Sequence, residues 1–135
     1  MIRAVILLLE REGKILFVKR SLQRKSLPGK WSLCSGKIEE GEEIFDAAKR
    51  EAMEELGLNL FDLEIFDEQE IKKEEEHKVL YFVKTKYSGE PKVIDEKEFS
   101  EIIEHSFEEF FNLFPDEEIG HGLQYLREKL IKELD

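Results

Sequence analysis

The chain has 135 residues and a formal net charge of −11 at pH 7, from 21 Lys and Arg against 32 Asp and Glu. This length supplies one domain with a buried core and is too short for two. The negative charge argues against a nucleic-acid polymer as partner, because such binding neutralises phosphates with cations. The single cysteine excludes an internal disulfide and fits a reducing compartment.

The charge is unevenly distributed along the chain. Residues 1–37 carry a net charge of +7 and residues 38–135 a net charge of −18. A basic first third joined to an acidic remainder suits a polyanionic ligand held between cations and metal-binding carboxylates. Ordinary scatter of surface charge is the alternative.

A β-hairpin is the first predicted element. Within the predicted strand Ile2–Leu9, the apolar run Ala4–Leu9 is too short for a signal sequence or a membrane span. We therefore expect a soluble, cytoplasmic protein with no membrane partner. A turn over residues 10–13 leads to the partner strand Lys14–Lys19, and the polar segment Ser21–Lys30 predicts a loop.

A short apolar stretch, Trp31–Ser35, precedes the first predicted helix. Strong helix formers fill Glu42–Leu56, and Gly57 predicts its end. One stripe of this helix is apolar and is expected to pack on the sheet. Its members are Phe45, Ala48, Ala52 and Leu56.

The second half of the chain predicts more strands and then helices. The strands are Leu58–Ile71, with an irregular middle, His77–Tyr87, and a short one within Lys92–Glu104. The helices are Ser106–Leu113, with Ser106 as N-cap, and a last one from about Glu117 to Leu134 with Ile119, Leu123, Leu126 and Leu130 on one face. This order predicts a mixed sheet with helices on both faces.

Three carboxylates share one face of the first helix. Glu51, Glu54 and Glu55 stand at positions i, i+3 and i+4, which are neighbours on a helix surface. Clustered hard oxygen ligands suit Mg²⁺ or Mn²⁺. For a helix standing alone in a chain this rich in glutamate, a solvated acidic face is the favoured explanation of the cluster.

Residues 36–58, GKIEEGEEIFDAAKREAMEELGL, resemble the Nudix box, G-x5-E-x7-R-E-U-x-E-E-x-G-U, where U is a bulky aliphatic residue. Every fixed position matches, and Ala52 is small for its U position. The resemblance implies an α/β fold, the Nudix-type α/β/α sandwich with a mixed β-sheet between helices. It also implies a single Nudix hydrolase domain over residues 1–135.

The resemblance implies the following site. Glu51 and Glu55 are the first choices as ligands of Mg²⁺, for which Mn²⁺ can substitute, followed by Glu54 and the backbone carbonyl near Ser35. The expected catalytic residues are Glu54, Glu51 and Arg50, with Arg50 orienting a glutamate rather than touching substrate. The expected supporting residues are Gly36, Glu42 and Gly57.

Substrate contacts are expected from several other segments. Arg20 and Lys37 are candidates for binding phosphates, and Glu118, like its neighbour Glu117, for binding a nucleobase edge. The general base comes from the box or from a distal loop that offers Asp95, Glu96 and Glu98. Family members often carry Leu-Pro-Gly-Gly-Lys where this chain has Leu33-Cys34-Ser35-Gly36-Lys37. We expect Cys34 to be a small buried side chain rather than a reactive one.

These features predict a Mg²⁺-dependent hydrolase that cleaves a diphosphate linkage in a small nucleotide, acting as a MutT-like (d)NTP pyrophosphatase. One alternative is a pyrophosphatase for ADP-ribose or a nucleotide sugar. Others are a non-catalytic Nudix nucleotide-binding module, which would tend to lose box glutamates, and an isopentenyl diphosphate isomerase-like enzyme, whose wider motifs are missing. A monomer and a homodimer are both compatible with the sequence.

Overall fold

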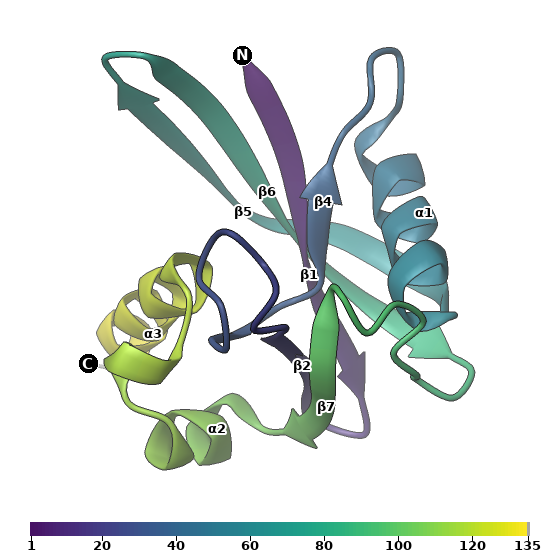
Figure 1. Cartoon of the computed structure of the whole chain (residues 1–135), viewed down its shortest axis with the longest axis vertical. Coiled ribbons are helices and arrows are strands. Elements are labelled where there is room, and N and C mark those ends of the chain that lie inside the picture. The colour runs from purple at the N-terminus through teal and green to yellow at the C-terminus, as the bar shows by residue number, and fades with distance from the viewer. Residues whose placement is uncertain (135) are drawn as a thin grey trace.

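A mixed seven-stranded sheet lies between helices in the computed structural model, which describes residues 1–134 and the side chains of residues 1–130 (Figure 1). Asp135, the last residue of the predicted domain, lies outside the described residues. The strands are β1 (Ile2–Arg11), β2 (Lys14–Arg20), β3 (Trp31–Ser32), β4 (Ser35–Lys37), β5 (Asn59–Lys73), β6 (Glu76–Ser88) and β7 (Phe99–His105). The helices are α1 (Ile44–Leu56), α2 (Phe107–Leu113), the 3₁₀ turn η1 (Asp116–Glu118) and α3 (His121–Leu134).

Strand β1 organises the sheet. The strand order is β3-β2-β1-β6-β5, with β4 paired to β1 and β7 paired to β2. β1 runs parallel to β6 and antiparallel to β2 and β4. The predicted hairpin is confirmed, and its turn residues Glu12 and Gly13 have φ of 53° and 77°, the left-handed pair that a tight hairpin turn requires.

Helix α1 covers one face of the sheet. Its buried side chains pack with Val5, Leu7 and Leu9 of β1 in one core cluster. Gly57 ends the helix at φ 71°, as predicted, but the helix begins at Ile44, two residues later than expected. The prediction for Phe45 is wrong. This residue is 36% exposed, because it lies at the margin of a buried face that also takes in Ala47 and Glu51.

Helices α2 and α3 cover the opposite face. Phe110 of α2 stacks on Phe17 of β2 with ring centroids 3.8 Å apart, beside Leu123 and Leu126 of α3. The predicted N-cap of α2 is confirmed, because the Ser106 side chain accepts the Glu109 N–H at 3.1 Å.

The predicted start of the last helix is wrong. α3 begins at His121, whereas residues 116–118 form η1 and Ile119 bridges to Trp31 of β3. The Gly120 N–H donates to the Trp31 carbonyl at 2.8 Å. Since the backbone of residues 119–120 is hydrogen-bonded to β3, it does not join the helix. This junction fixes the beginning of α3 against the sheet.

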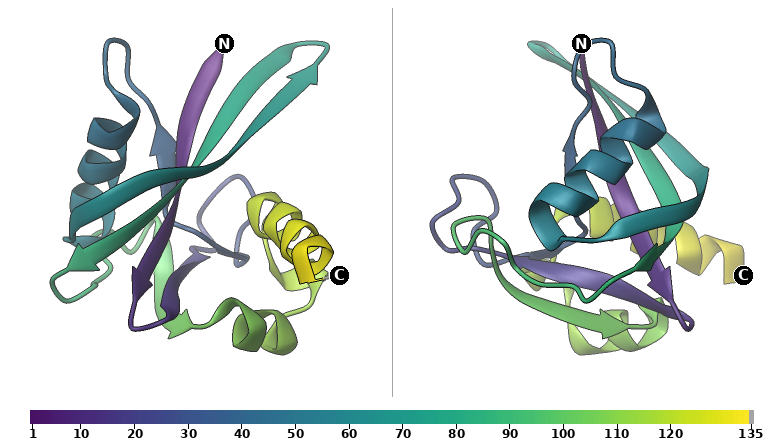
Figure 2. Two further views of the ribbon diagram at one scale, coloured as in Figure 1. Left: turned by 180° about the vertical axis from the view of Figure 1, so that it is seen from behind. Right: turned by 90° about the vertical axis from the view of Figure 1, so that its right-hand side faces the viewer.

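A long hairpin forms the other side of the sheet. β5 and β6 pair antiparallel, and the register shifts between Phe61 and Glu64 and again between Ile65 and Asp67. These shifts confirm the predicted irregular middle of the strand. Figure 2 shows the hairpin reaching past the helices, which lie on opposite sides of the sheet. Within residues 1–134, no helix has the length and apolar character needed to cross a membrane.

Candidate active site

The Glu51 carboxylate lies directly against the backbone of Gly36. β4 pairs with β1 so that Gly36 lies opposite Val5, and α1 packs over this strand. A Cβ added to Gly36 would lie 2.0 Å from Cδ of Glu51, which is only 8% exposed. No side chain fits at position 36 while Glu51 stays in place. The glycine of the box therefore leaves the space that the buried Glu51 carboxylate occupies.

Glu55 forms a pair with Glu51 one helical turn further on. Burial of Glu55, followed by the negative charge of Glu51, raises the pKa of the Glu55 carboxyl to about 8, and the two carboxyl groups share a hydrogen bond. The Cys34 thiol donates to Oε2 of Glu55 over 3.4 Å. Cys34 is fully buried, as predicted, and burial together with Glu55 raises the pKa of its thiol.

Arg50 holds the carboxylates of the box in fixed positions. Its guanidinium donates to both carboxylate oxygens of Glu42, at 2.8 and 3.0 Å, and to Oε1 of Glu51 at 2.8 Å. It also donates to the Lys37 carbonyl at 2.9 Å and to Glu54 at 3.3 Å. The hydrogen bond between Arg50 and Glu42 favours the charged form of both groups. It therefore lowers the pKa of Glu42 and raises the pKa of Arg50. Such a fork between charged groups gives strong, directional bonds.

The oxygen donors of this region suit Mg²⁺. In the part of the chain that the structure describes, no three His, Cys, Asp or Glu side chains converge as a complete metal cage. Glu54 lies apart from the buried pair, 59% exposed and bonded to Arg50. Mg²⁺ is usually bound by one or two carboxylates, with waters and substrate phosphates completing the shell. Glu51 and Glu55, beside a glycine cradle that admits no side chain, fit this requirement.

The Ser35 carbonyl lies on the outer edge of β4. The Leu7 N–H donates to the Cys34 carbonyl, and the Ile38 N–H donates to the Arg3 carbonyl. Because hydrogen-bonded positions alternate along an antiparallel pair, the backbone groups of Ser35 and Lys37 point away from β1. The Lys37 carbonyl follows this rule, since it accepts from Arg50. The Ser35 carbonyl thus faces outward at the same edge.

Arg20 lines a neighbouring cavity, and the charge of Glu55 acts on its guanidinium. It donates to the carbonyl and hydroxyl of Ser26 at 2.9 and 2.8 Å. Burial lowers the pKa of Arg20, while the nearby charges of Glu98 and Glu55 raise it. The Glu98 charge also raises the pKa of Glu55, and Glu98 is itself held by Arg24 at 2.7 Å.

The other loop acids lie in different surroundings. Asp95 accepts the Lys97 N–H within its own turn, and Glu96 lines a separate pocket beside Phe99. The side chain of Lys37 is exposed at the end of β4. Of the three loop acids expected from the sequence, Glu98 is thus the one that acts electrostatically on Glu55.

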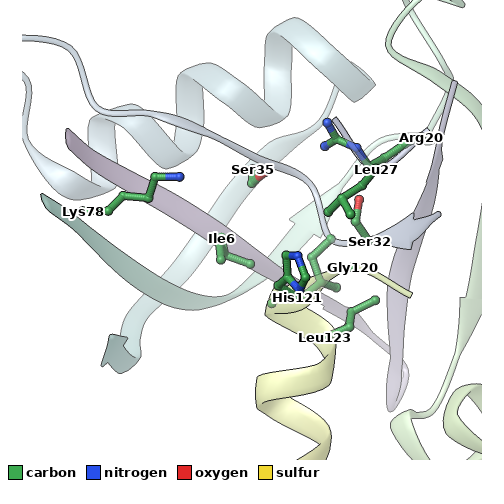
Figure 3. Close-up of a pocket in the computed structure, with 11 residues that line it drawn as sticks. Ile6, Arg20, Leu27, Ser32, Ser35, Lys78, Gly120, His121 and Leu123 are labelled. Atoms are coloured by element: carbon green, nitrogen blue, oxygen red, sulfur yellow. The ribbon is translucent and has the colours of Figure 1, made fainter. Parts of the chain in front are cut away.

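A cavity of about 230 Å³ opens beside this site, between β1 and the start of α3 (Figure 3). Its lining comes from six separate segments of the chain: Ile6, Arg20, Leu27, Ser32, Leu33, Ser35, Lys78, Gly120, His121, Gly122 and Leu123. Arg20 and Ser35 were expected at the site. Glu118 is exposed on η1 and is not among these lining residues. Lys78 and His121 were missed, because only the β1–β6 pairing and the late start of α3 bring them here.

The chain resembles known proteins in both sequence and fold. Nucleoside triphosphatase NudI of Escherichia coli O139:H28 is 41% identical over 58 residues, which are 43% of this chain and 41% of NudI. NudI of Escherichia fergusonii is 44% identical over 50 residues, which are 37% of this chain and 36% of NudI. The chain therefore spans less than half the length of these curated relatives.

Solved structures share the fold over most of the chain. The MutT NUDIX hydrolase from Burkholderia pseudomallei superposes with a TM-score of 0.78 at 24% identity, over 92% of this chain and 93% of that one. The MutT protein from Methanosarcina mazei Go1 gives 0.77 at 22% identity, over 99% and 95%. The Escherichia coli ORF135 protein gives 0.70 at 27% identity, over 83% and 78%.

The predicted α/β sandwich with a mixed sheet is confirmed by these superpositions. The family model of the NUDIX domain matches residues 1–125, which include the whole box and the residues of the buried carboxylate pair. The chain therefore belongs to the Nudix family.

Proposed function

We propose that the chain is a divalent-cation-dependent hydrolase that cleaves a diphosphate linkage in a nucleotide, and that it acts as a MutT-like (d)NTP pyrophosphatase. The observation that carries this proposal is the buried Glu51 carboxylate lying against the Gly36 backbone, with the half-buried Glu55 beside it. Relatives named nucleoside triphosphatase and MutT support the substrate class. We further propose a cytoplasmic location, in keeping with the single buried thiol, Cys34.

Mg²⁺ is the proposed cofactor, with Mn²⁺ as a substitute. Glu51, Glu55 and the Ser35 carbonyl would hold it, with Glu54 as a possible further ligand once released from Arg50. When bound, the cation supplies charge neutralisation of the diphosphate and a bound water of lowered pKa. The positive charge of a bound cation would oppose the burial and the Glu51 charge that raise the pKa of Glu55.

The remaining roles belong to neighbouring side chains. Arg50 keeps Glu51 oriented through its bond to Oε1, while its other donors are anchored on Glu42 and Lys37. For Arg20 we propose phosphate binding, supported by its place in the cavity wall and by the Glu55 charge, which is near enough to raise the pKa of Arg20. For the general base we propose a glutamate of the box or Glu98. Lys37 and Glu118 remain predictions as substrate contacts.

A substrate panel with product identification tests the proposal. Purified protein with Mg²⁺ is incubated with the common NTPs and dNTPs, ADP-ribose and a nucleotide sugar, and the products are separated by anion exchange. The expected result is a nucleoside monophosphate plus pyrophosphate from triphosphates, abolished by EDTA and restored by Mg²⁺ or Mn²⁺. Release of two monophosphates from ADP-ribose alone would move the assignment to the diphosphate-derivative class.

Variants connect that activity to the carboxylate pair. Glu55→Gln and Glu51→Gln are each expected to lower kcat/KM by more than the roughly 10- to 100-fold that outer-shell changes cost. Asp46→Asn removes an exposed acid from the same helix, outside the Arg50 network, and should leave the activity unchanged. Full activity in both glutamine variants would overturn the proposal.

A further inference from the structure

The loop between β6 and β7, residues 89–98, is docked on the C-terminal end of α1 (Figure 1). The Lys92 N–H donates to the Leu56 carbonyl at 3.3 Å, and the Ile94 N–H donates to the Glu55 carbonyl at 3.4 Å. The last carbonyls of an α-helix receive no hydrogen bond within the helix, so the loop supplies the donors that these two carbonyls lack. The loop is thereby held against the turn of α1 that carries Glu55.

The backbone of Glu98, the last residue of this loop, is fixed, whereas its side chain is only partly packed. The Glu98 carbonyl accepts the Ser21 N–H at 3.0 Å, and the Glu98 N–H donates to the Asp95 carbonyl at 3.0 Å. The side chain is 43% exposed, so packing alone does not select one rotamer. After burial and the charge of Glu51, the Glu98 charge is a further cause of the raised pKa of Glu55. The orientation of Glu98 therefore matters to the carboxylate pair.

Arg24 supplies the contact that fixes this side chain. Nη1 of Arg24 donates to Oε2 of Glu98 at 2.7 Å, a distance typical of strong bonds between charged groups. The Arg24 N–H also closes a turn on the Ser21 carbonyl at 3.2 Å. One short segment, residues 21–24, thus holds Glu98 twice: the Ser21 N–H bonds its backbone and Arg24 bonds its side chain.

The ion pair between Arg24 and Glu98 suits orientation better than stability. Partly exposed ion pairs contribute little to the stability of a fold. In the metal-free protein the charge of the Glu51–Glu55 pair repels a third carboxylate, so Glu98 without its partner would turn toward solvent. Arg24 opposes this repulsion from a segment whose own backbone is fixed. Its guanidinium therefore determines where the Glu98 carboxylate lies.

We propose that Arg24 is a positioning residue, which fixes the Glu98 carboxylate near the Glu51–Glu55 pair so that Glu98 serves as the general base. The inference rests on the proposed function, and it selects Glu98 among the candidates for the base. Glu98 takes a proton from the attacking water as the water oxygen bonds to phosphorus. The bond from phosphorus to the bridging oxygen breaks, and its electron pair leaves with that oxygen. Arg24 touches neither the substrate nor the reacting atoms.

A double-variant cycle tests whether Arg24 acts through Glu98. With saturating Mg²⁺ and substrate, Glu98→Gln is expected to lower kcat by at least about 100-fold, the usual contribution of a general base. Arg24→Gln should lower kcat roughly tenfold, as expected for a group that orients another. The double variant should lose no more than Glu98→Gln alone, because Arg24 then has no base to orient. Additive losses, or full kcat in either single variant, would overturn the proposal.

Two further variants separate positioning from the mere loss of an ion pair. Arg24→Lys keeps a charged donor for the single bond to Glu98, so kcat should return to within about threefold of the unmodified protein. Arg127→Gln is the control, because Arg127 of α3 forms a similar pair with Asp116 of η1, at 3.0 Å, and should leave kcat unchanged. Equal losses in Arg24→Gln and Arg127→Gln would contradict the proposal.

Crystal structures of Arg24→Gln give a readout that does not depend on activity. The Glu98 carboxylate is expected to turn away from its place in the unmodified protein, while Glu51 and Glu55 keep theirs. Displaced Glu98 in a protein that hydrolyses no nucleotide would refute the hydrolase, and with it the base, but keep Arg24 as the group that positions Glu98. Metal-dependent hydrolysis with unmoved Glu98 and unchanged kcat in this variant would keep the hydrolase and refute the positioning role.

Discussion

The site has two halves that meet the substrate in opposite ways. On the α1 side, carboxylates are tightly paired: Glu51 bonds to Arg50, and Glu55 bonds to Glu51 and Cys34. On the α3 side, Lys78 pairs with Glu76 and Arg20 donates to Ser26, and the Ser32 hydroxyl has no partner in the described chain. Preorganised negative charge suits a cation, whereas the N–H groups at the start of α3, which have no acceptor within the helix, suit a group that accepts hydrogen bonds.

We expect the α1 side and the α3 side of the site to perform different functions. The α1 side is expected to govern the rate with every nucleotide, because it would hold the cation. The α3 side is expected to govern which nucleotide is preferred. Arg20 belongs to both sides, because it lines the cavity and is influenced by the charge of Glu55. Each of the following changes acts mainly on one side and therefore tests the division.

The largest effect is expected from Gly36→Ala. Its new Cβ would lie 2.0 Å from Cδ of Glu51, so the carboxylate must move, and a displacement of about 1 Å costs on the order of 100-fold in rate. Gly120→Ala is the counterpart on the α3 side, where the nearest atoms would be 3.6 Å away. It should alter the preference among bases and leave the rate with the best substrate within a fewfold. Steady-state kinetics on both variants would reject the division if Gly36→Ala changed only the preference.

A smaller loss is expected from Arg50→Lys. Lysine keeps the charge but cannot reproduce the fork that bonds to Glu42, Glu51 and Lys37 at the same time. We expect metal affinity or kcat/KM to fall roughly 10- to 100-fold for all nucleotides alike. Mn²⁺ titration and kinetics measure the two quantities. Lys49→Arg, at an exposed neighbouring position, serves as the control and should behave as the unmodified protein.

The stability of the metal-free protein is expected to fall as pH rises. The pKa of Glu55 is raised from 4.5 to about 8, first by burial and then by Glu51, so the folded protein retains a proton that the unfolded chain releases. The stabilisation is complete below pH 4.5 and is lost as pH rises through about 8, at up to about 1.4 kcal/mol per pH unit. Urea unfolding in EDTA between pH 5 and 8 measures this slope. Glu55→Gln should flatten it, and a flat profile in the unmodified protein would contradict the account.

The smallest effect concerns stability on the α3 side. Ser32→Ala should raise the free energy of unfolding by about 1 kcal/mol, because it removes a buried hydroxyl without a partner. Ser21→Ala is the comparison, since the buried Ser21 hydroxyl accepts the Gln23 N–H at 3.1 Å. That variant should lose about 1 kcal/mol. The reverse order in chemical denaturation would show that Ser32 has a partner in solution.

The α1 side could be predicted from sequence because its parts are local. Glu51, Glu54, Glu55 and Arg50 lie within two turns of one helix, and Gly57 ends that helix as expected. The resemblance placed Glu51 and Glu55 ahead of Glu54 as ligands, but the helix spacing alone did not show that Glu51 is buried and Glu54 exposed. That distinction depends on β4, which covers Glu51 but leaves Glu54 exposed.

The α3 side could not be predicted because its parts are distant in sequence. Lys78 reaches the cavity through the parallel pairing of β1 with β6, a long-range contact with no local signal. His121 is there because the bridge between Ile119 and Trp31 delays the start of α3. The acids expected to read the base, Glu117 and Glu118, instead lie on the preceding 3₁₀ turn.

Anomalous diffraction from a crystal soaked with Mn²⁺ and a non-hydrolysable nucleotide tests the central claim most directly. The account predicts a manganese peak in contact with carboxylate oxygens of both Glu51 and Glu55 and with the Ser35 carbonyl. A bound nucleotide with no manganese at this place, and with Glu51 and Glu55 still hydrogen-bonded to each other, would contradict it.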